Sequence, residues 1–468
     1  MGINANIFRQ YDIRGIADRD LTPEVVELLG QALGIYLEQR GIKKVAVGAD
    51  NRLSSPRLKE NLINGLRIAG LQVSDLGTIV TPMAYFSVHY CSVDAAVMIT
   101  GSHNPPEENG FKITVGQGTI YGDEITELYN IMTDISAGKI AASKKVGYNY
   151  GLVKNFDIIT PYLFMLREKI KLGRRRLKVA VDCGNGTASL FAESILTSWG
   201  CDVVPLYCES DSSFPNHQPD PVKTVNLRDL QRVVLRERCD LGVAYDGDAD
   251  RIGVVDEKGN IVWGDTLMAL YWREILAKFP GAPAIIEVKC SQALIDEVSR
   301  LGGNPFFYKT GHSLIKAKMK EIGAPFTGEM SGHMFFADEY FGFDDAFYAT
   351  GRLLRILSNS NHTLSELLEI VPRYHATAET RISCPDEEKF AVVERLVNYF
   401  RERCVVVDVD GARVLFGDGW GLVRASNTQP VLVARCEAKT PAGLQRICGE
   451  MKKVISAQPH VGNFEWEF

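Results

Sequence analysis

The chain of 468 residues is longer than a single hydrophobic core supports, and its length predicts about three to four domains. An apolar content of 46%, a charged content of 24% and a formal net charge of −6, without a basic block, argue against a nucleic-acid partner. No apolar run approaches the ~18 residues of a membrane span, so we expect no membrane partner. The ten cysteines lack paired C-x-x-C spacings, and the first residues lack a secretory signal, which together predict a cytoplasmic protein with reduced thiols.

A strand–helix–strand pattern occurs three times, at intervals of roughly a hundred residues. The first copy follows a helix at 21–40 and has strands at 44–48 and 71–76 around a helix at 56–69. The second copy has strands at 177–183 and 202–207 around a helix that ends at Trp199. The third copy has strands at 283–289 and 305–309 around a helix that ends at Leu301. The repetition predicts three similar α/β domains with mixed, mostly parallel sheets.

The last part of the chain, from about Val371, has a different pattern. It predicts a strand at 376–383, a helix at 386–403, short strands from 405 to 436 and a helix at 441–456. This order is typical of an α+β domain. The predicted domains are therefore residues 1–153, 154–259, 260–371 and 372–468.

The segment Thr100–Ile113 is the first that points to chemistry. It follows the apolar run Ala95–Ile99, which predicts a buried strand, and its glycine and prolines predict a tight turn at the strand's carboxyl end. Ligands gather at this end of open parallel sheets. With His103 beside it and Lys112 ten residues on, the hydroxyl of Ser102 is a candidate phosphate carrier. The alternative is a polar turn capped by Ser and Asn.

Three aspartates follow one another at every second position, Asp246, Asp248 and Asp250, between the apolar strands 241–245 and 252–256. Three carboxylates brought together call for a counter-ion, because like charges repel. Hard oxygen ligands of this type suit Mg²⁺. The alternative is a solvated acidic turn, but the flanking apolar strands favour a metal site.

Three further loops carry polar side chains between apolar segments. The loop Gly328–His333 can bind hydroxyl groups, although alone it reads as a surface loop. Arg424–Pro430 combines an arginine, two hydroxyls and an amide, a set that can cradle an anion or form a polar hairpin loop. Lys309–Ser313 places His312 after a predicted strand, as a minor candidate for a base.

In this order and at these separations, the segments resemble the α-D-phosphohexomutase family, and most closely its bacterial phosphomannomutase/phosphoglucomutase branch. The resemblance covers essentially the whole chain and rests on Tyr11–Gly15, Thr100–Ile113, Asp246–Arg251, Gly328–His333 and Arg424–Pro430. It implies four domains around a central cleft, each supplying one loop. It also implies reversible phosphoryl transfer between O1 and O6 of mannose and glucose phosphates, through a phosphoserine enzyme and a hexose 1,6-bisphosphate.

The resemblance also implies roles for single residues. Mg²⁺ would be bound by Ser102, Asp246, Asp248 and Asp250, with Ser102 carrying the phosphoryl group. The candidate catalytic residues, which the sequence does not rank, are Ser102, His103, Lys112, Arg14, Arg251 and His312. The candidate substrate-binding residues are Tyr11, Lys289, Glu329, Ser331, His333, Arg424, Ser426, Asn427 and Thr428. The expected partners are small hexose phosphates, and the expected state is a monomer or a weak homodimer.

Three other functions compete with this interpretation. A metal-dependent sugar phosphatase would use Ser102 or Asp246 as its nucleophile and admit water to the phosphoenzyme. A non-catalytic sugar-phosphate sensor would not need the intact serine and aspartates. Within the family the nearest rival is phosphoglucosamine mutase, against which Gly101 and Met330 favour the mannose/glucose branch. Asn51, before Arg52, is an unfamiliar residue in its turn, whose role stays open.

Overall fold

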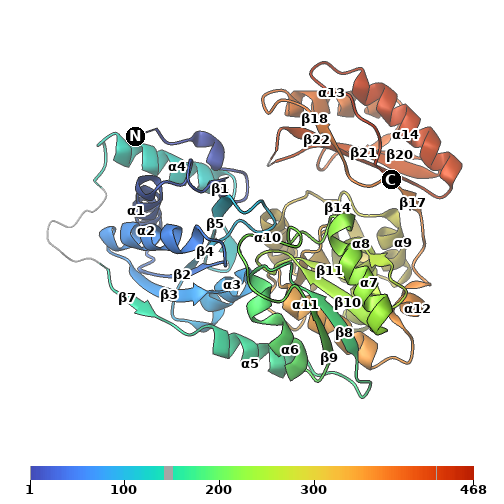
Figure 1. The fold of residues 1–468 in the computed structure, drawn as a ribbon. Helices are drawn as coiled ribbons and strands as arrows, with labels where there is room; N and C mark the ends of the chain where they lie inside the picture. The colour runs from blue at the N-terminus through green and yellow to red at the C-terminus, as the bar shows by residue number, and fades with distance from the viewer. Residues whose placement is uncertain (1, 142–150, 428, 468) are drawn as a thin grey trace. The chain divides into compact units, whose positions relative to one another are not determined.

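The computed structural model describes residues 2–141, 151–427 and 429–467 (Figure 1). The described chain forms two compact units. Unit 1 consists of Met1–Gly264 and Ser331–Leu367, and unit 2 consists of Asp265–Met330 and Leu368–Phe468. The third predicted segment, residues 260–371, therefore contributes to both units.

The first sheet of unit 1 has seven strands in the order β1-β5-β4-β2-β3-β7, with β6 paired to β5. They are β1 (Ile13–Ile16), β2 (Lys44–Ala49), β3 (Gln72–Thr78), β4 (Ala95–Ile99), β5 (Glu108–Val115), β6 (Gly118–Thr119) and β7 (Val153–Asn155). Strands β4, β2, β3 and β7 are parallel neighbours, whereas β5 is antiparallel to β4 and to β1. The strands predicted at 44–48, 71–76 and 95–99 are confirmed, with small shifts at their ends.

The helices of this part are α1 (Pro23–Gln39), α2 (Ser55–Ile68), α3 (Thr81–Tyr90) and α4 (Asp123–Ser136), after a short 3₁₀ helix, Ala5–Ile7. Helix α1 begins at a cap: the side chain of Thr22 accepts a hydrogen bond from the N–H of Val25, and Pro23 occupies the first turn. Helices α1 and α2 pack backbone against backbone, because a Cβ on Gly65 would lie 2.0 Å from the carbonyl oxygen of Glu27. The helices predicted at 21–40 and 56–69 are thus confirmed as α1 and α2, with small shifts at their ends.

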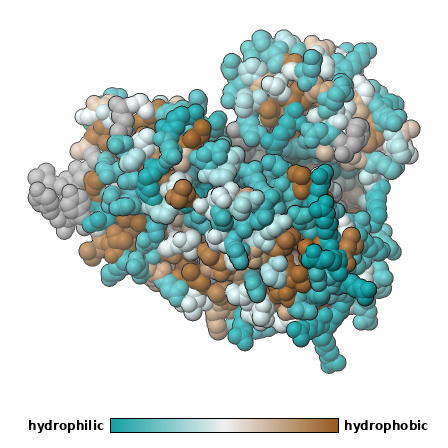
Figure 2. Space-filling model, in the orientation of Figure 1, coloured by the Kyte–Doolittle hydropathy of each residue, from teal (hydrophilic) through white to brown (hydrophobic). Residues whose placement is uncertain are grey.

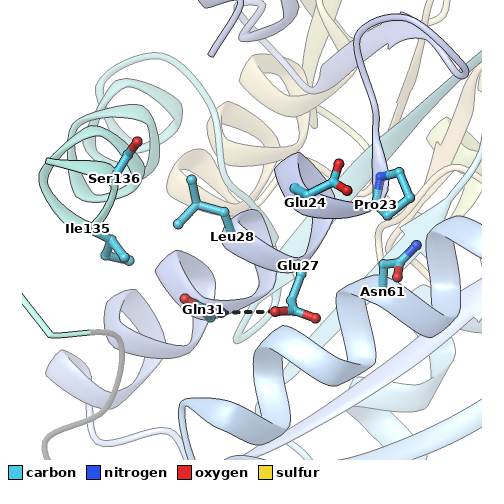
Figure 3. A pocket seen from close by; sticks show the side chains of 8 residues that line it. All are labelled: Pro23, Glu24, Glu27, Leu28, Gln31, Asn61, Ile135 and Ser136. Carbon is cyan, nitrogen blue, oxygen red and sulfur yellow. Dashed lines mark hydrogen bonds between the residues drawn. The ribbon is translucent and has the colours of Figure 1, made fainter. Parts of the chain in front are cut away.

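A surface groove of about 410 Å³ is formed by residues of α1, α2 and α4 (Figure 3). It is lined by Pro23, Glu24, Glu27, Leu28, Gln31, Asn61, Ile135 and Ser136. Gln31 donates a hydrogen bond of 3.5 Å to Glu27 within it. None of these lining residues belongs to the segments predicted to carry chemistry, so we assign the groove no function.

The second sheet of unit 1 has the order β12-β11-β10-β8-β9. Its strands are β8 (Lys178–Asp182), β9 (Asp202–Leu206), β10 (Leu241–Tyr245), β11 (Ile252–Asp256) and β12 (Ile261–Val262). Strands β9, β8 and β10 are parallel, and β10 and β11 form an antiparallel hairpin. This part of the unit also contains α5 (Ile159–Lys169), the 3₁₀ helix Thr187–Leu190, α6 (Ala192–Ser198), the 3₁₀ helix Thr224–Leu227, α7 (Arg228–Glu237), β16 (Met334–Phe336) and α11 (Ala346–Ser358). The hairpin turn, residues 246–251, lies at the carboxyl end of β10.

Unit 2 contains the third strand–helix–strand pattern. Its elements are α8 (Gly264–Lys278), β13 (Pro283–Glu287), α9 (Gln292–Arg300), β14 (Asn304–Tyr308), α10 (His312–Ile322) and β15 (Phe326–Gly328). Strands β13 and β14 are parallel, as are β2 with β3 and β8 with β9 in the other two copies. The three predicted α/β repeats are confirmed.

The last sheet, in unit 2, has the order β17-β22-β21-β20-β19, with β18 paired to β22. Its strands are β17 (His375–Ala376), β18 (Thr380–Ser383), β19 (Val405–Val407), β20 (Ala412–Phe416), β21 (Gly419–Ala425) and β22 (Val431–Ala438). All their pairings are antiparallel. With α13 (Lys389–Arg401) and α14 (Pro441–Ser456) they form the predicted α+β domain. The short helix α12 (Leu364–Leu368) precedes it.

Two predictions for this domain are wrong in detail. The strand expected at 376–383 is interrupted, because the N–H of Ala378 donates to the carbonyl oxygen of Glu467. The helix expected from residue 386 begins at Lys389, since a turn follows Pro385 and Asp386 accepts a hydrogen bond from the Lys389 ammonium instead. The first difference depends on a contact with a residue far along the chain, and the second on a local turn that hydrophobic periodicity does not indicate.

No helix in the described part of the chain is long and apolar enough to cross a membrane. On the face drawn in Figure 2, hydrophilic residues cover most of the surface and apolar residues form separate patches. Leu152 and Phe164 are among the exposed apolar side chains. The side chains of the predicted chemistry, such as Ser102 and Asp246, are instead buried.

Candidate active site

Ser102 lies in a tight turn just after β4, whose five residues are all buried. Its φ is +47°, in the left-handed region that residues other than glycine rarely adopt. Its N–H donates to the hydroxyl of Thr100 at 2.8 Å. A backbone of this kind persists only where its surroundings fix it.

Arg52 fixes this turn, and the sequence interpretation gave it no role. Its buried guanidinium donates to four carbonyl oxygens, those of Ser102 (2.7 Å), Asn104 (2.7 Å), Pro105 (2.5 Å) and Glu108 (2.9 Å). Asp50 balances the charge, with Oδ2 3.2 Å from Arg52 Nε, and also accepts a hydrogen bond from the N–H of Gly101. A Cβ on Gly101 would lie 2.4 Å from the guanidinium carbon, so this position requires glycine. The available signal was an arginine in the short turn after β2, three residues beyond the end of the strand.

The neighbouring Asn51 also has a structural role. Its amide nitrogen donates to the carbonyl oxygen of Asn185 and to the hydroxyl of Ser210, both at 2.9 Å. Its backbone N–H donates to the hydroxyl of Thr187 at 3.1 Å. Asn51 therefore connects the turn after β2 to the loop after β8.

The three aspartates of the β10–β11 turn are completely buried. The hydroxyl of Ser102 donates to Asp246 Oδ2 at 2.8 Å, so the two predicted loops meet. Gly247 permits this contact, because a Cβ there would lie 2.2 Å from the carbonyl oxygen of Ser102. Asp246 Oδ1 accepts hydrogen bonds from the N–H groups of Asp250 and Arg251. Burial, with the neighbouring carboxylates, raises the pKa of Asp246 well above its ordinary value.

The carboxylate oxygens of this turn fit a hard divalent cation. One oxygen from each of Asp246, Asp248 and Asp250 lies within 4.8 Å of the others. Asp248 Oδ1 and Asp250 Oδ1 are buried and accept no hydrogen bond from the described residues. Buried carboxylate oxygens without donors are costly, and a cation would satisfy them. The donor set therefore suits Mg²⁺.

Two predicted cations border the aspartates. Lys112, on β5, donates to Asp248 Oδ2 at 2.7 Å and also to Asp250. Burial opposes its charge, but the two carboxylates outweigh burial and raise the pKa of Lys112. Arg14, on β1, is 2.6 Å from Asp12 and donates to the carbonyl oxygen of Gly101. Lys112 thus contacts the aspartate turn, and Arg14 contacts the turn that carries Ser102.

Two histidines and an arginine complete this group in unit 1. His103 Nδ1 lies 3.2 Å from Ser102 Oγ, and burial, followed by nearby cations, lowers the pKa of His103 well below its ordinary value. Arg251 Nε donates to His333 Nε2 at 2.9 Å. His333 Nδ1 lies 3.0 Å from Asp344 Oδ2. Asp344 is a further residue that the sequence interpretation did not assign.

Two other predicted substrate ligands belong to unit 1. Tyr11 is buried two residues before β1. Ser331 is half-buried and precedes Gly332, whose φ is +95° and where a Cβ would lie 2.3 Å from the carbonyl oxygen of Ile252. The segment that begins at Ser331 thus lies directly against β11.

Unit 2 brings together another part of the predicted site. Glu329 is buried and its Oε1 accepts a hydrogen bond from the N–H of Gly311 at 2.8 Å. His312 is buried at the start of α10. Lys289 Nζ donates to Glu379 Oε2 at 3.0 Å and lies 3.8 Å from Glu287. The Lys289 charge lowers the pKa of Glu379 to about 2.

The predicted phosphate loop connects β21 and β22, which are antiparallel. Arg424, at the end of β21, is held by Asp410, whose Oδ2 lies 2.9 Å from Arg424 Nε. Ser426 Oγ accepts a hydrogen bond from the N–H of Gln429. Asn427 is half-buried beside it, and Thr428 lies outside the described residues. The predicted site residues are thus divided between two groups, one in each unit.

Comparison with known proteins finds relatives whose match covers nearly the whole chain. Models of the phosphoglucomutase/phosphomannomutase family match the chain for alpha/beta/alpha domain I at residues 5–139, domain II at 160–259, domain III at 263–374 and the C-terminal domain at 379–454. The chain is 44% identical over 462 residues to a phosphomannomutase/phosphoglucomutase of Pseudomonas aeruginosa, covering 97% of each chain. It is 42% identical to a phosphoglucomutase of Neisseria gonorrhoeae, covering 98% of each.

A solved structure shares the fold. It is a phosphoglucomutase/phosphomannomutase family protein from Burkholderia thailandensis, with a TM-score of 0.90 and 38% identity, and the match covers 100% of both chains.

Proposed function

The chain belongs to the phosphoglucomutase/phosphomannomutase family, and we propose that it moves a phosphoryl group between O1 and O6 of glucose and mannose phosphates by way of Ser102. Its family makes the chain a hexose-phosphate mutase, an isomerase. The observation that carries the proposal is the 2.8 Å contact between Ser102 Oγ and the buried Asp246. A nucleophile joined to an acidic metal loop suits a phosphoserine.

The proposed reaction has two transfers. The phosphoserine gives its phosphoryl group to the free hydroxyl of a hexose monophosphate: the bond from phosphorus to Ser102 Oγ breaks, a bond to the sugar oxygen forms, and the hydroxyl proton passes to a side chain of the site. The hexose 1,6-bisphosphate then turns around and returns its other phosphoryl group to Ser102: the bond from phosphorus to the second sugar oxygen breaks, the bond to Ser102 Oγ forms again, and the sugar oxygen takes a proton from a side chain of the site. His103 Nδ1, 3.2 Å from Ser102 Oγ, is placed to take the serine proton in this second transfer.

Phosphoryl transfer requires mainly positioning and neutralisation of charge. We assign Mg²⁺ to Asp246, Asp248 and Asp250, with the phosphoserine oxygen; when bound, it neutralises charge on the phosphoryl group. Lys112 stays charged because of its two carboxylate partners, so we assign it to the phosphoryl oxygens rather than to proton abstraction.

The residues of unit 2 have a complementary role in this proposal. We assign Glu329 and Ser331 to the sugar hydroxyls. Arg424, with Ser426, Asn427 and Thr428, binds the phosphate that is not being transferred, because a guanidinium matches a phosphate bidentately. The partners are thus hexose phosphates; a cytoplasmic location and a monomer or weak homodimer remain predictions from the sequence.

We predict activity on both sugars. Glucose and mannose differ at C2, so residues that bind O3 and O4 cannot distinguish them, and the preference stays below the ~10⁴-fold of a site built for one hydroxyl. The test is kcat/KM for glucose 1-phosphate, mannose 1-phosphate and glucosamine 1-phosphate, with hexose 1,6-bisphosphate present. Glu329→Gln is expected to weaken glucose and mannose phosphates together. Glu321→Gln, on an exposed part of α10, is the control.

The same assay separates the other functions. A clear preference for glucosamine 1-phosphate would assign the chain to phosphoglucosamine mutase and contradict the proposed substrates. Release of inorganic phosphate without isomerisation would indicate a sugar phosphatase. Binding without turnover of any of the three sugars would indicate a sensor.

A further inference from the structure

We propose that Asp410 and Glu287, two carboxylates without an assigned role, are positioning residues of the hexose-phosphate site. They join the predicted phosphate ligand Arg424 and the loop of the predicted sugar ligand Glu329 to one shared segment, Thr310–Gly311. The inference rests on the proposed function, because it concerns how those ligands are held.

Asp410 connects the phosphate loop to the segment after β14. It lies in the turn between β19 and β20, and its Oδ2 accepts hydrogen bonds from Arg424 Nε at 2.9 Å and from the N–H of Thr310 at 3.0 Å. The turn packs closely against Arg424, because a Cβ on Gly411, whose φ is +87°, would lie 2.7 Å from Arg424 Cβ. Only 5% of the Arg424 side chain and 17% of the Asp410 side chain are exposed, so water screens the ion pair little. One carboxylate oxygen therefore fixes both the guanidinium and the Thr310 backbone.

Glu287 connects the same segment to two other loops. It ends β13, pairs in register with Tyr308 of β14, and is completely buried. This register brings the residues that follow both strands together, and Glu287 Oε1 accepts a hydrogen bond from the Thr310 hydroxyl at 2.6 Å. Its Oε2 accepts one from the N–H of Met330 at 3.3 Å, and Oε1 accepts one from the N–H of Lys289 at 3.4 Å. Glu287 thereby touches the Lys289 loop and the loop of Glu329.

The third connection is made by Glu329 itself, which accepts the N–H of Gly311 at 2.8 Å. Gly311 has a φ of +133°, a conformation that side-chain-bearing residues rarely adopt. Two successive backbone N–H groups and one hydroxyl are thus held by three different carboxylates: Asp410, Glu287 and Glu329. Moving any of the three carboxylates displaces the segment that the other two bind.

This arrangement has a consequence for substrate binding. In the proposed reaction the phosphate at Arg424 and the hydroxyls at Glu329 belong to one sugar, so the distance between these two ligands must be kept. An interaction with the phosphate that is not transferred is equally strong in the ground state and the transition state. Its loss raises KM and leaves kcat nearly unchanged.

The experiment compares the steady-state kinetics of five variants with those of the wild type, on glucose 1-phosphate and mannose 1-phosphate. We expect Asp410→Ala to raise KM about tenfold or more for both sugars, because Arg424 loses the charged hydrogen bond that holds its guanidinium, with kcat changing much less. The KM of Asp410→Asn should lie between those of the wild type and Asp410→Ala, because an amide oxygen still accepts one hydrogen bond but carries no charge. Thr310→Val should raise KM, because it removes the hydroxyl that donates to Glu287. Thr310→Ser keeps a hydroxyl and should have a KM close to that of the wild type. Asp418→Ala, a surface ion-pair carboxylate of the same domain, should leave KM unchanged.

Two results would overturn the inference: a KM of Asp410→Ala equal to that of Asp418→Ala, or a Thr310→Ser variant as impaired as Thr310→Val. Calorimetric binding of glucose 6-phosphate to the folded variants gives a second readout, and an unchanged Kd for both Asp410→Asn and Thr310→Val would contradict it as well. A wild-type protein without mutase activity would instead overturn the proposed function, so the two failures are distinguishable.

Discussion

At the scale of single residues, Ser102 combines a left-handed backbone with a buried hydroxyl aimed at Asp246. A serine in an ordinary exposed turn would have neither property. Here the hydroxyl of Thr100 and the guanidinium of Arg52 hold the backbone, so the fold itself orients the Ser102 hydroxyl. Removing the hydroxyl leaves these supports in place.

We therefore expect Ser102→Ala to fold normally and to lose about 10⁴-fold or more of its turnover, because no other side chain replaces the nucleophile. Mutase kinetics and thermal unfolding of the same preparation test this. Turnover near that of the wild type would rule out the phosphoserine, and a collapsed melting temperature would show that the hydroxyl is structural.

Arg52 gives a second residue-scale prediction. Lysine keeps the charge but lacks the planar fork that reaches four carbonyl oxygens at once. Arg52→Lys is expected to lower kcat about 100-fold, because more than one buried hydrogen bond to a charged group is lost at about 1.5–3 kcal/mol each. Arg57→Lys removes a similar fork from a side chain that is 33% exposed and donates to the carbonyl oxygens of Leu21 and Ala17 instead, so it should be nearly neutral. Equal kinetics for the two variants would show that Arg52 does not position Ser102.

At the scale of elements, helices α1 and α2 depend on two facing glycines. A Cβ on Gly30 would lie 2.4 Å from the carbonyl oxygen of Leu62, and one on Gly65 would lie 2.0 Å from that of Glu27. Neither contact can be relieved by a side-chain rotation, because both neighbours are backbone atoms. The helices would have to separate, and the buried leucines between them, such as Leu29 and Leu66, would lose contacts.

Gly65→Ala is accordingly expected to lower the free energy of unfolding by about 1–3 kcal/mol, the usual cost of overpacking. The matched control is Gly449→Ala in α14, where a Cβ would meet nothing within 4 Å. There alanine should stabilise the protein by up to about 1 kcal/mol, because glycine is the poorer helix former. Denaturant unfolding measures both, and a neutral Gly65→Ala would mean that the helices tolerate separation.

The sequence predicted the elements that local patterns determine, and it missed the roles that depend on contacts between residues far apart in the chain. The strands around Ser102 and the aspartates were found because their apolar runs end at glycines and charged residues. The parallel pairing within each repeat followed from the strand–helix–strand order. The roles of Arg52, Asp410 and Glu287 were missed, because each depends on a partner at least 23 residues away, which no local pattern contains. The interruption of the strand at Ala378 likewise depends on the chain's last residues.

At the scale of the whole molecule, the proposed metal ligands and the proposed ligands of the non-transferred phosphate lie in different units. The group in unit 1 places three buried aspartates against Lys112, whereas in unit 2 the cations Lys289 and Arg424 are paired with Glu379 and Asp410. A divalent cation is therefore expected to bind unit 1 and inorganic phosphate to bind unit 2. The two ligands should stabilise different parts of the same chain.

Hydrogen exchange read by mass spectrometry tests this division. A ligand that binds only the native state at 100 times its Kd stabilises it by about 2.7 kcal/mol, which slows exchange by about 100-fold where opening releases the ligand. We expect Mg²⁺ to slow exchange in residues 246–251 and around Ser102 but not in the β21–β22 hairpin, and chelation to reverse this together with activity. In the Asp248→Asn/Asp250→Asn double variant the Mg²⁺ effect should vanish, because the oxygens that lack donors lose their charge. Protection by Mg²⁺ in that variant, or equal protection of both units, would mean that the aspartates do not hold the cation.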